Sequence, residues 1–318
     1  VGWDGNEEEY KRYLEKTFDE TKVPVEVRDD DGPIVEPSYK AWWGVPDMPK
    51  VNFESKEARQ WALDVTKHWI ENFDIDGWRM DVAKELDFSF WKEFRDIAHK
   101  ANKDTLLISE IFGDTSQWLQ GDRFDGTMNY SFREAMTDYF ATKRINNKEF
   151  ADSLANLYSM YSFEALSSCQ NLLSSHDVKR FLNRCGNEED GILGAIFLQA
   201  TFPGIAGIYY GDEIGLGGAD DPFNREPFPW HSKESWNSTI LDYTKKLMNI
   251  KKSSSIFKYG RFELLDDNEK FVGFRRILKD ESMLCIINRS KSNDDFNIIS
   301  NAHSVNVIHC DCAANLDQ

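Results

Sequence analysis

Acidic residues recur at regular intervals along this chain, each after a short apolar segment, and this spacing constrains the fold most. Asp81 and Glu110 are 29 residues apart, Glu110 and Asp177 are 67 apart, and Asp177 and Glu213 are 36 apart. In an eight-unit barrel of about 250 residues, one strand–helix unit takes roughly 30 residues. The intervals therefore correspond to one, two and one such units.

Strand and helix patterns alternate through the same region. Period-two apolar segments predict strands at 73–82, 105–111, 126–130, 171–175 and 207–210, and helical periodicity predicts helices that start at Ser55 and near 90, and at 132–142, 150–161, 192–201 and 238–252. This alternation predicts a parallel sheet with helices outside it. Because the strands of such a barrel end at one rim, Asp81, Glu110, Asp177 and Glu213 should meet there.

The pattern changes near residue 253 to short alternating strands at 259–265, 271–278, 282–288, 296–299 and 304–309. These predict a small antiparallel β-sandwich domain. We therefore divide the chain into an irregular loop region of the barrel (1–54), the C-terminal part of a (β/α)8 barrel (55–252) and a β domain (253–318). Trp61 and Trp69 on the first predicted helix, Trp91 on the second and the strand residue Trp78 are expected in the core.

The charge balance limits the partners. The 318 residues include 38 Lys and Arg against 55 Asp and Glu, so the net charge is −17. Such a field repels nucleic acids and anionic membranes, and the apolar stretches are far shorter than the ~20 residues of a membrane span. The five cysteines are an odd number without regular spacing, which indicates reduced thiols and favours a cytoplasmic location.

The carboxylates also suggest a chemistry. Arg79 and Asp81 share one face of a strand at positions i and i+2, so the guanidinium can keep the carboxylate ionised. An ionised carboxylate, a second carboxyl that stays protonated, and a third charge nearby are the groups that cleave a glycosidic bond. The alternative is that these residues are ordinary strand-end and surface ions.

Three segments carry a family resemblance: GWRMDVA at 77–83, ISEI at 108–111 and NLLSSHD at 171–177. They resemble the second, third and fourth signature regions of the alpha-amylase family. The segments WWG at 42–44, FDGTMNY at 124–130 and YYGDEIG at 209–215 are similar to the cyclomaltodextrinase, neopullulanase and maltogenic amylase branch. The resemblance implies a (β/α)8 barrel of which strands four to eight are identifiable here.

The resemblance also implies residue roles. Asp81 is implied as the nucleophile of a retaining mechanism, Glu110 as the general acid and base, and Asp177 as the group that stabilises the distorted sugar. Arg79 would orient Asp81, and His176 would bond to the sugar just before the cleaved bond. Asp221 and Arg225, in DPFNR at 221–225, would contact sugars further toward the non-reducing end, and the loop residue Trp43 would stack on glucose.

The sequence also gives expectations for two neighbours of these residues, Phe112 and Arg180. Phe112 stands where this branch usually has Trp, so we expect an altered acceptor side. Arg180, four residues after His176, is expected as a salt-bridge partner at the rim.

The implied function is hydrolysis of α-1,4-glucosidic bonds in cyclodextrins, maltooligosaccharides, starch or pullulan. The alternatives are a non-catalytic glucan-binding scaffold, or an α-glucosidase or glucosyltransferase of the same clan. No cofactor or metal is expected to be required, although a structural calcium ion, as in some relatives, is an open alternative. The family's first signature region does not occur in these residues, so we expect a longer protein or completion by another segment. A homodimer would form through segments absent here.

Overall fold

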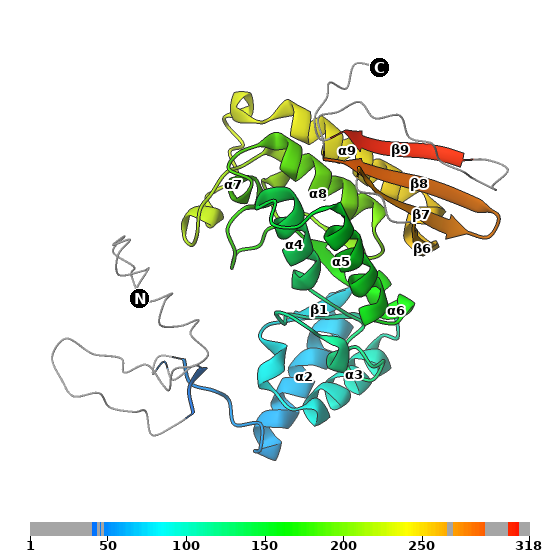
Figure 1. The fold of residues 1–318 in the computed structure, drawn as a ribbon. Coiled ribbons are helices and arrows are strands. Elements are labelled where there is room, and N and C mark those ends of the chain that lie inside the picture. The colour runs from blue at the N-terminus through cyan, green and yellow to red at the C-terminus, as the bar shows by residue number, and fades with distance from the viewer. Residues whose placement is uncertain (1–39, 43–44, 46–47, 266–269, 290–304, 312–318) are drawn as a thin grey trace. The chain divides into compact units, whose positions relative to one another are not determined.

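The computed structural model describes residues 40–42, 45, 48–265, 270–289 and 305–311, the last range for its backbone only (Figure 1). The chain divides into two compact units, Val1–Val65 and Thr66–Gln318, which are described separately. In the first unit, Ala41 pairs with Pro49 in an antiparallel bridge, and the Lys50 ammonium lies 4.5 Å from the ring centroid of Trp42. The boundaries that we predicted at 54 and 252 stay predictions.

Helix α2 (Lys56–Phe73) begins where Ser55 predicts it. The Ser55 hydroxyl accepts a hydrogen bond from the backbone N–H of Ala58 (3.3 Å), as expected of an N-cap. The core prediction fails on this helix, because Trp61 is 62% exposed and Trp69 is 42% exposed. Helical periodicity identifies an apolar face but not what covers it. Trp91 is buried as expected, and Trp78 is half-buried.

Five short parallel strands follow one another in chain order. Strands β1 (Gly77–Met80), β2 (Leu106–Ser109) and β3 (Gly126–Thr127) form one parallel sheet, and β4 (Gln170–Leu172) and β5 (Ile205–Gly207) form another. A parallel bridge between Met128 and Gln170 places β3 beside β4. The order β1-β2-β3-β4-β5 is the one that repeated strand–helix units produce.

The connections between these strands are mostly helical. The α-helices between them are α3 (Phe88–Ala101), α4 (Tyr130–Met136) with its π-helical continuation η4 (Thr137–Ala141), α5 (Asn147–Met160), α6 (Phe163–Ser168), α7 (Phe181–Arg184) and α8 (Glu189–Thr201). After β5 come α9 (Ser238–Ser253) and α10 (Ser255–Tyr259). Three of these helices, α6, α7 and α10, were not predicted, because helices of four to six residues are too short to show a helical period.

The C-terminal sheet corrects the predicted antiparallel sandwich in part. Strands β6 (Arg261–Leu264), β7 (Val272–Leu278) and β8 (Glu281–Asn288) are antiparallel as expected, but β9 (Val305–Asp311) pairs with β8 in parallel. Within the described residues these strands form one sheet, not two packed sheets. Period-two alternation predicts a strand but not its direction, which depends on the connection. The strand predicted at 296–299 lies outside the described residues.

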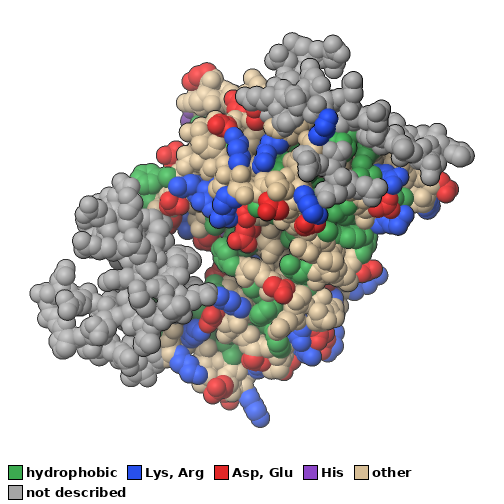
Figure 2. Space-filling view, viewed as in Figure 1, with side chains coloured by type: hydrophobic (Ala, Val, Ile, Leu, Met, Phe, Trp, Pro, Cys, Tyr) green, Lys and Arg blue, Asp and Glu red, His purple; other side chains and the backbone are tan. Residues whose placement is uncertain are grey.

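The cysteines, the surface charges and the helices can be compared with what the composition predicts. Cys169, Cys185 and Cys285 are free and buried, as expected of reduced thiols. Basic and acidic side chains are interspersed over the face seen in Figure 2. In the part of the chain that the structure describes, every helix is too short or too polar to cross a membrane.

Candidate active site

The ends of β1 and β2 place two acidic residues side by side. Met80 and Ser109 are partners in the parallel register, so Asp81 and Glu110 each follow at the next position. The Glu110 N–H donates to the Met80 carbonyl (2.9 Å), which keeps the two strand ends together. Val82 then adopts a left-handed conformation with φ of 43°. For a β-branched residue this conformation is strained by roughly 1–3 kcal/mol, and such strain clusters at functional sites.

Arg79 joins the two carboxylates. Its Nη1 lies 2.5 Å from Oδ1 of Asp81, and its Nη2 forms an ion pair with Oε1 of Glu110. The backbone N–H of Val82 donates to the other oxygen of Glu110 (3.2 Å). Glu110 is only 5% exposed, whereas the Asp81 side chain is 70% exposed. The site therefore contains one buried and one open carboxyl that share a cation.

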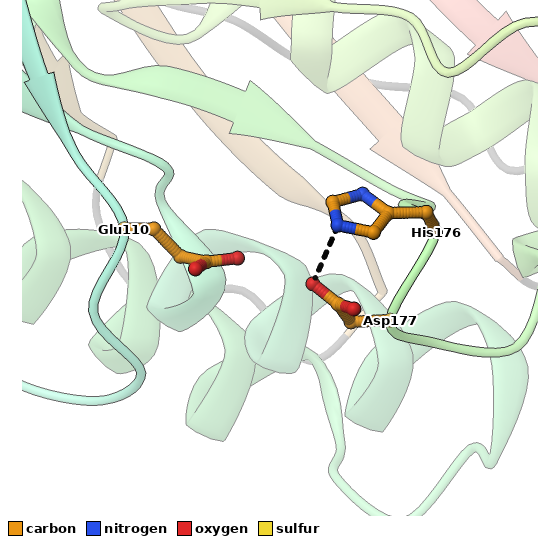
Figure 3. Close-up of side chains that lie close together, drawn as sticks. All are labelled: Glu110, His176 and Asp177. Atoms are coloured by element: carbon orange, nitrogen blue, oxygen red, sulfur yellow. Dashed lines mark ion pairs between the residues drawn. The ribbon is translucent and has the colours of Figure 1, made fainter. Parts of the chain in front are cut away.

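The loop after β4 brings a third carboxylate to the same place. His176 Nε2 lies 3.1 Å from Oδ2 of Asp177, and Figure 3 shows both side chains together with the carboxyl group of Glu110. Potential ligand atoms of Glu110, His176 and Asp177 all lie within 4.8 Å of one another. Asp81, Glu110 and Asp177 thus converge as their spacing predicts.

The environment moves the pKa values of the first two carboxyls apart. Burial, with the neighbouring Asp81 carboxyl, raises the pKa of Glu110 to about 7, against the attraction of Arg79. Burial also acts to raise the pKa of Asp81, but hydrogen bonds with Glu110 and Arg79 outweigh it and hold that pKa below its usual value. At neutral pH, Asp81 is ionised and Glu110 can carry a proton. Two carboxyls separated in this way can serve as nucleophile and acid.

Asp221 and Arg225 lie at the edge of this cluster. Arg225 Nε is 2.8 Å from Oδ1 of Asp221 and donates to the His176 carbonyl (2.9 Å), and Arg225 Nη2 is 3.6 Å from Oδ1 of Asp177. Arg225 is the last residue of the short helix η6 (Phe223–Arg225), and Asp221 lies two residues before that helix. The remaining predicted residue, Trp43, lies outside the described residues.

Asn224 is a site residue that the sequence did not indicate. Its side chain is fully buried, and its Nδ2 donates to the backbone carbonyls of Ser175 (3.3 Å), His176 (2.9 Å) and Val178 (3.0 Å). These bonds tie the loop that contains Arg225 to the loop that contains Asp177. The only signal in the sequence is its position within the DPFNR segment.

Arg180 is a salt-bridge partner, as expected, and it is buried. Its side chain is 0% exposed, and Nη1 lies 3.3 Å from Oδ1 of Asp212 and 2.7 Å from the Tyr210 carbonyl. Glu213, predicted as the fourth carboxylate of the rim, accepts a hydrogen bond from the Gly211 N–H in its own turn, and its position at the rim stays a prediction. The regular spacing located this turn, but the residue of the turn that pairs with Arg180 is Asp212 and not Glu213.

Tyr130 lies near the carboxylate cluster, since the charges of Glu110 and Asp177 act on its hydroxyl group, and Phe112 packs against its ring. The Tyr130 hydroxyl lies 3.1 Å from Oγ of Ser175, and its ring stacks on Phe112 with centroids 3.8 Å apart. Burial raises the pKa of Tyr130 to about 12, so its hydroxyl stays protonated. Phe112 is 53% exposed.

Comparison with known proteins matches this arrangement to a family. The catalytic domain of alpha amylase matches residues 37–258. The chain belongs to the alpha-amylase family. It is 39% identical over 246 residues to neopullulanase 2 of Thermoactinomyces vulgaris, a match that covers 77% of this chain and 42% of that protein. It is 37% identical over 256 residues to a cyclomaltodextrinase of Geobacillus thermopakistaniensis (strain MAS1), covering 80% and 43%.

The structural comparison agrees. A solved cyclomaltodextrinase superposes with a TM-score of 0.77 and 30% sequence identity over 84% of this chain and 45% of that chain. The fold of the family's catalytic domain is a (β/α)8 barrel, to which the parallel strands and outer helices belong. The chain spans less than half the length of these relatives.

Proposed function

We propose that this protein hydrolyses α-1,4-glucosidic bonds in cyclodextrins, maltooligosaccharides, starch or pullulan with retention of configuration. The observation that carries the proposal is the pair Asp81 and Glu110, bridged by Arg79, with pKa values moved in opposite directions. The relatives named neopullulanase and cyclomaltodextrinase support the class of substrate.

The proposed reaction has two displacements. Asp81 attacks the anomeric carbon while Glu110 gives its proton to the departing glycosidic oxygen, so that a covalent glycosyl ester forms on Asp81. Glu110, now ionised, then takes a proton from water, and the water oxygen displaces Asp81 from the sugar. Each inversion reverses the other, so the product keeps the configuration of the substrate.

The neighbouring residues have supporting roles in this proposal. Arg79 keeps Asp81 ionised before the attack and is already paired with both carboxyls. His176 and Asp177 would hold hydroxyl groups of the same sugar. Asp221 and Arg225, and Trp43 outside the described residues, would contact glucosyl units further along the chain. The strands β1 to β5 would then be strands four to eight of the barrel.

We propose further that the reaction requires no metal ion. Glu110, His176 and Asp177 lie close enough to hold a cation. However, Glu110 is already bonded to Arg79 and Val82, and its raised pKa favours a proton there. Turnover should therefore survive dialysis against EDTA, and a loss that calcium restores would contradict this proposal.

The function is tested by incubating the 318-residue protein with β-cyclodextrin and with maltoheptaose. We expect release of maltooligosaccharides from both, and loss of that release in Asp81→Asn. The matched control is Asp122→Asn, which removes a surface carboxylate that pairs with Lys92. Saturable binding without turnover in the parent protein would instead support a scaffold. Release of glucose alone, or formation of new linkages, would support an α-glucosidase or glucosyltransferase.

A further inference from the structure

Three aromatic side chains form an exposed cluster on the loop between η6 and α9. The ring centroids of Phe228 and Trp230 are 4.3 Å apart, those of Phe228 and Trp236 are 5.4 Å apart, and those of Trp230 and Trp236 are 6.4 Å apart. Trp230 is 65% exposed, while the other two are half-buried beneath it. The proposed reaction assigns no role to this cluster.

The backbone that presents this aromatic cluster is held at several points. Trp236 Nε1 donates to the Pro229 carbonyl (3.1 Å), and the Tyr210 hydroxyl donates to the Glu226 carbonyl (2.8 Å). At the end of the loop, the Asn237 N–H donates to the Ile214 carbonyl (3.0 Å). The exposed indole of Trp230 is therefore presented on a fixed frame, which lowers the entropic cost of binding to it.

The aromatic cluster is also close in sequence to the residues that are proposed to contact the substrate. Trp230 is five residues after Arg225, so its Cα lies at most about 18 Å from that of Arg225. Arg225 itself contacts Asp177 and Asp221. A glucan that extends past Asp221 and Arg225 can cover this span with a few glucosyl units. Flat aromatic faces suit the C–H surfaces of pyranose rings, because both are apolar and planar.

We propose that Phe228, Trp230 and Trp236 form a distal subsite that binds glucosyl units of longer α-glucans beyond Asp221 and Arg225. Trp230 is the contact residue, and Phe228 and Trp236 support its ring. This subsite makes the protein prefer long maltooligosaccharides to short ones. The inference rests on the proposed function, because the occupant is a further part of the same substrate.

Binding measurements test the distal subsite without requiring turnover. In the Asp81→Asn background, the dissociation constants for maltotriose and maltoheptaose are measured by titration calorimetry, with and without Trp230→Ala. We expect Trp230→Ala to weaken maltoheptaose binding by roughly two- to tenfold, as for the loss of one aromatic contact, and to change maltotriose binding less than twofold. Trp230→Phe should retain most of the affinity for maltoheptaose.

The control is Tyr259→Ala, which removes an aromatic side chain of equal exposure (66%) from α10. We expect it to leave both dissociation constants unchanged. An equal effect of Trp230→Ala on the two ligands, no effect on either, or the same effect from Tyr259→Ala would overturn the distal subsite. Absence of turnover in the parent protein would overturn the proposed function alone, since these binding results are read independently.

Discussion

The rim beyond β1, β2 and β4 and the junction between α8 and the C-terminal sheet both contain partly or fully buried cations, but with different partners. At the rim, Arg79 pairs with the carboxylates of Asp81 and Glu110. At the junction, Lys251 donates to the carbonyls of Ala200 and Phe202, and Arg276 donates to the carbonyls of Gly260 and Thr201. The carbonyl groups at the end of α8 need hydrogen-bond donors, but they carry no charge that can change. The two carboxyls of the rim can exchange protons, and one of them is open to solvent, so the rim is suited to acid–base chemistry on a bound molecule.

The pKa values express the same difference. Burial raises the pKa of the acid Glu110 to about 7 and lowers the pKa of the base Lys251 to about 7. Titration of Glu110 should therefore appear in the reaction rate, and titration of Lys251 should appear in the free energy of unfolding.

Among changes that keep both carboxyls, the largest effect is expected from removing the rim cation. Arg79→Met should lower kcat/KM by about 10²–10³-fold, because it removes a preorganised charge beside both carboxyls. It should also move the acidic limb of the pH–rate profile upward, since Asp81 loses the cation that holds its pKa down. Steady-state kinetics on maltoheptaose measure both effects. A loss of less than tenfold would mean that Arg79 has only a structural role.

The pH dependence of the parent protein comes next. The acid Glu110 must be protonated to act, so kcat/KM should fall by about tenfold per pH unit as pH rises above about 7. Above pH 7 the expected loss is therefore about a hundredfold by pH 9. In Glu110→Gln this alkaline limb should disappear along with most of the activity. An alkaline limb that persists in the variant belongs to another group.

The smallest effect on activity is expected at the junction. Lys251→Met should leave kcat/KM at pH 7 within about twofold, because the ammonium of Lys251 bonds to backbone carbonyls at the end of α8 and not to the carboxylates of the rim in the described part of the chain. The free energy of unfolding should respond instead. The folded pKa of about 7 lies below the ordinary 10.5, so the unfolded chain binds more protons between these values and the stability of the parent rises with pH there.

Urea denaturation between pH 7 and 10 checks this expectation. The slope of unfolding free energy against pH should be smaller in Lys251→Met than in the parent. Lys245→Met, on the same helix α9, is the control and should keep the parent's slope. Equal slopes in all three proteins would contradict the assignment of this pH dependence to Lys251.

Many residues of the rim could be predicted, because strand spacing and short motifs in the sequence identify them. Asp81, Glu110 and Asp177 follow strands at unit intervals, and parallel strands must end together. Asn224 and Arg180 could not be assigned in the same way. Their roles depend on which backbone carbonyls and which Asp face them after folding, and no local pattern encodes those contacts.

Burial and strand direction were the least predictable features of the fold. Trp61 and Trp91 both lie on apolar helical faces, yet one is 62% exposed and the other 1%. Hydrophobic periodicity is the same whether or not another element covers the face. Likewise β9 has the alternation of an antiparallel strand, but its partner β8 runs parallel to it.

The central claim is that Asp81 attacks the sugar while Glu110 supplies the proton, and trapping the ester tests it most directly. The Glu110→Gln variant is incubated with α-maltosyl fluoride, whose fluoride leaves without help from an acid. The variant then has no base to activate water, so the ester on Asp81 is hydrolysed slowly. Intact-mass spectrometry should then show one added maltosyl group, and peptide mapping should place it on Asp81. Unmodified protein after turnover of the fluoride, or an adduct on a different residue, would contradict the account.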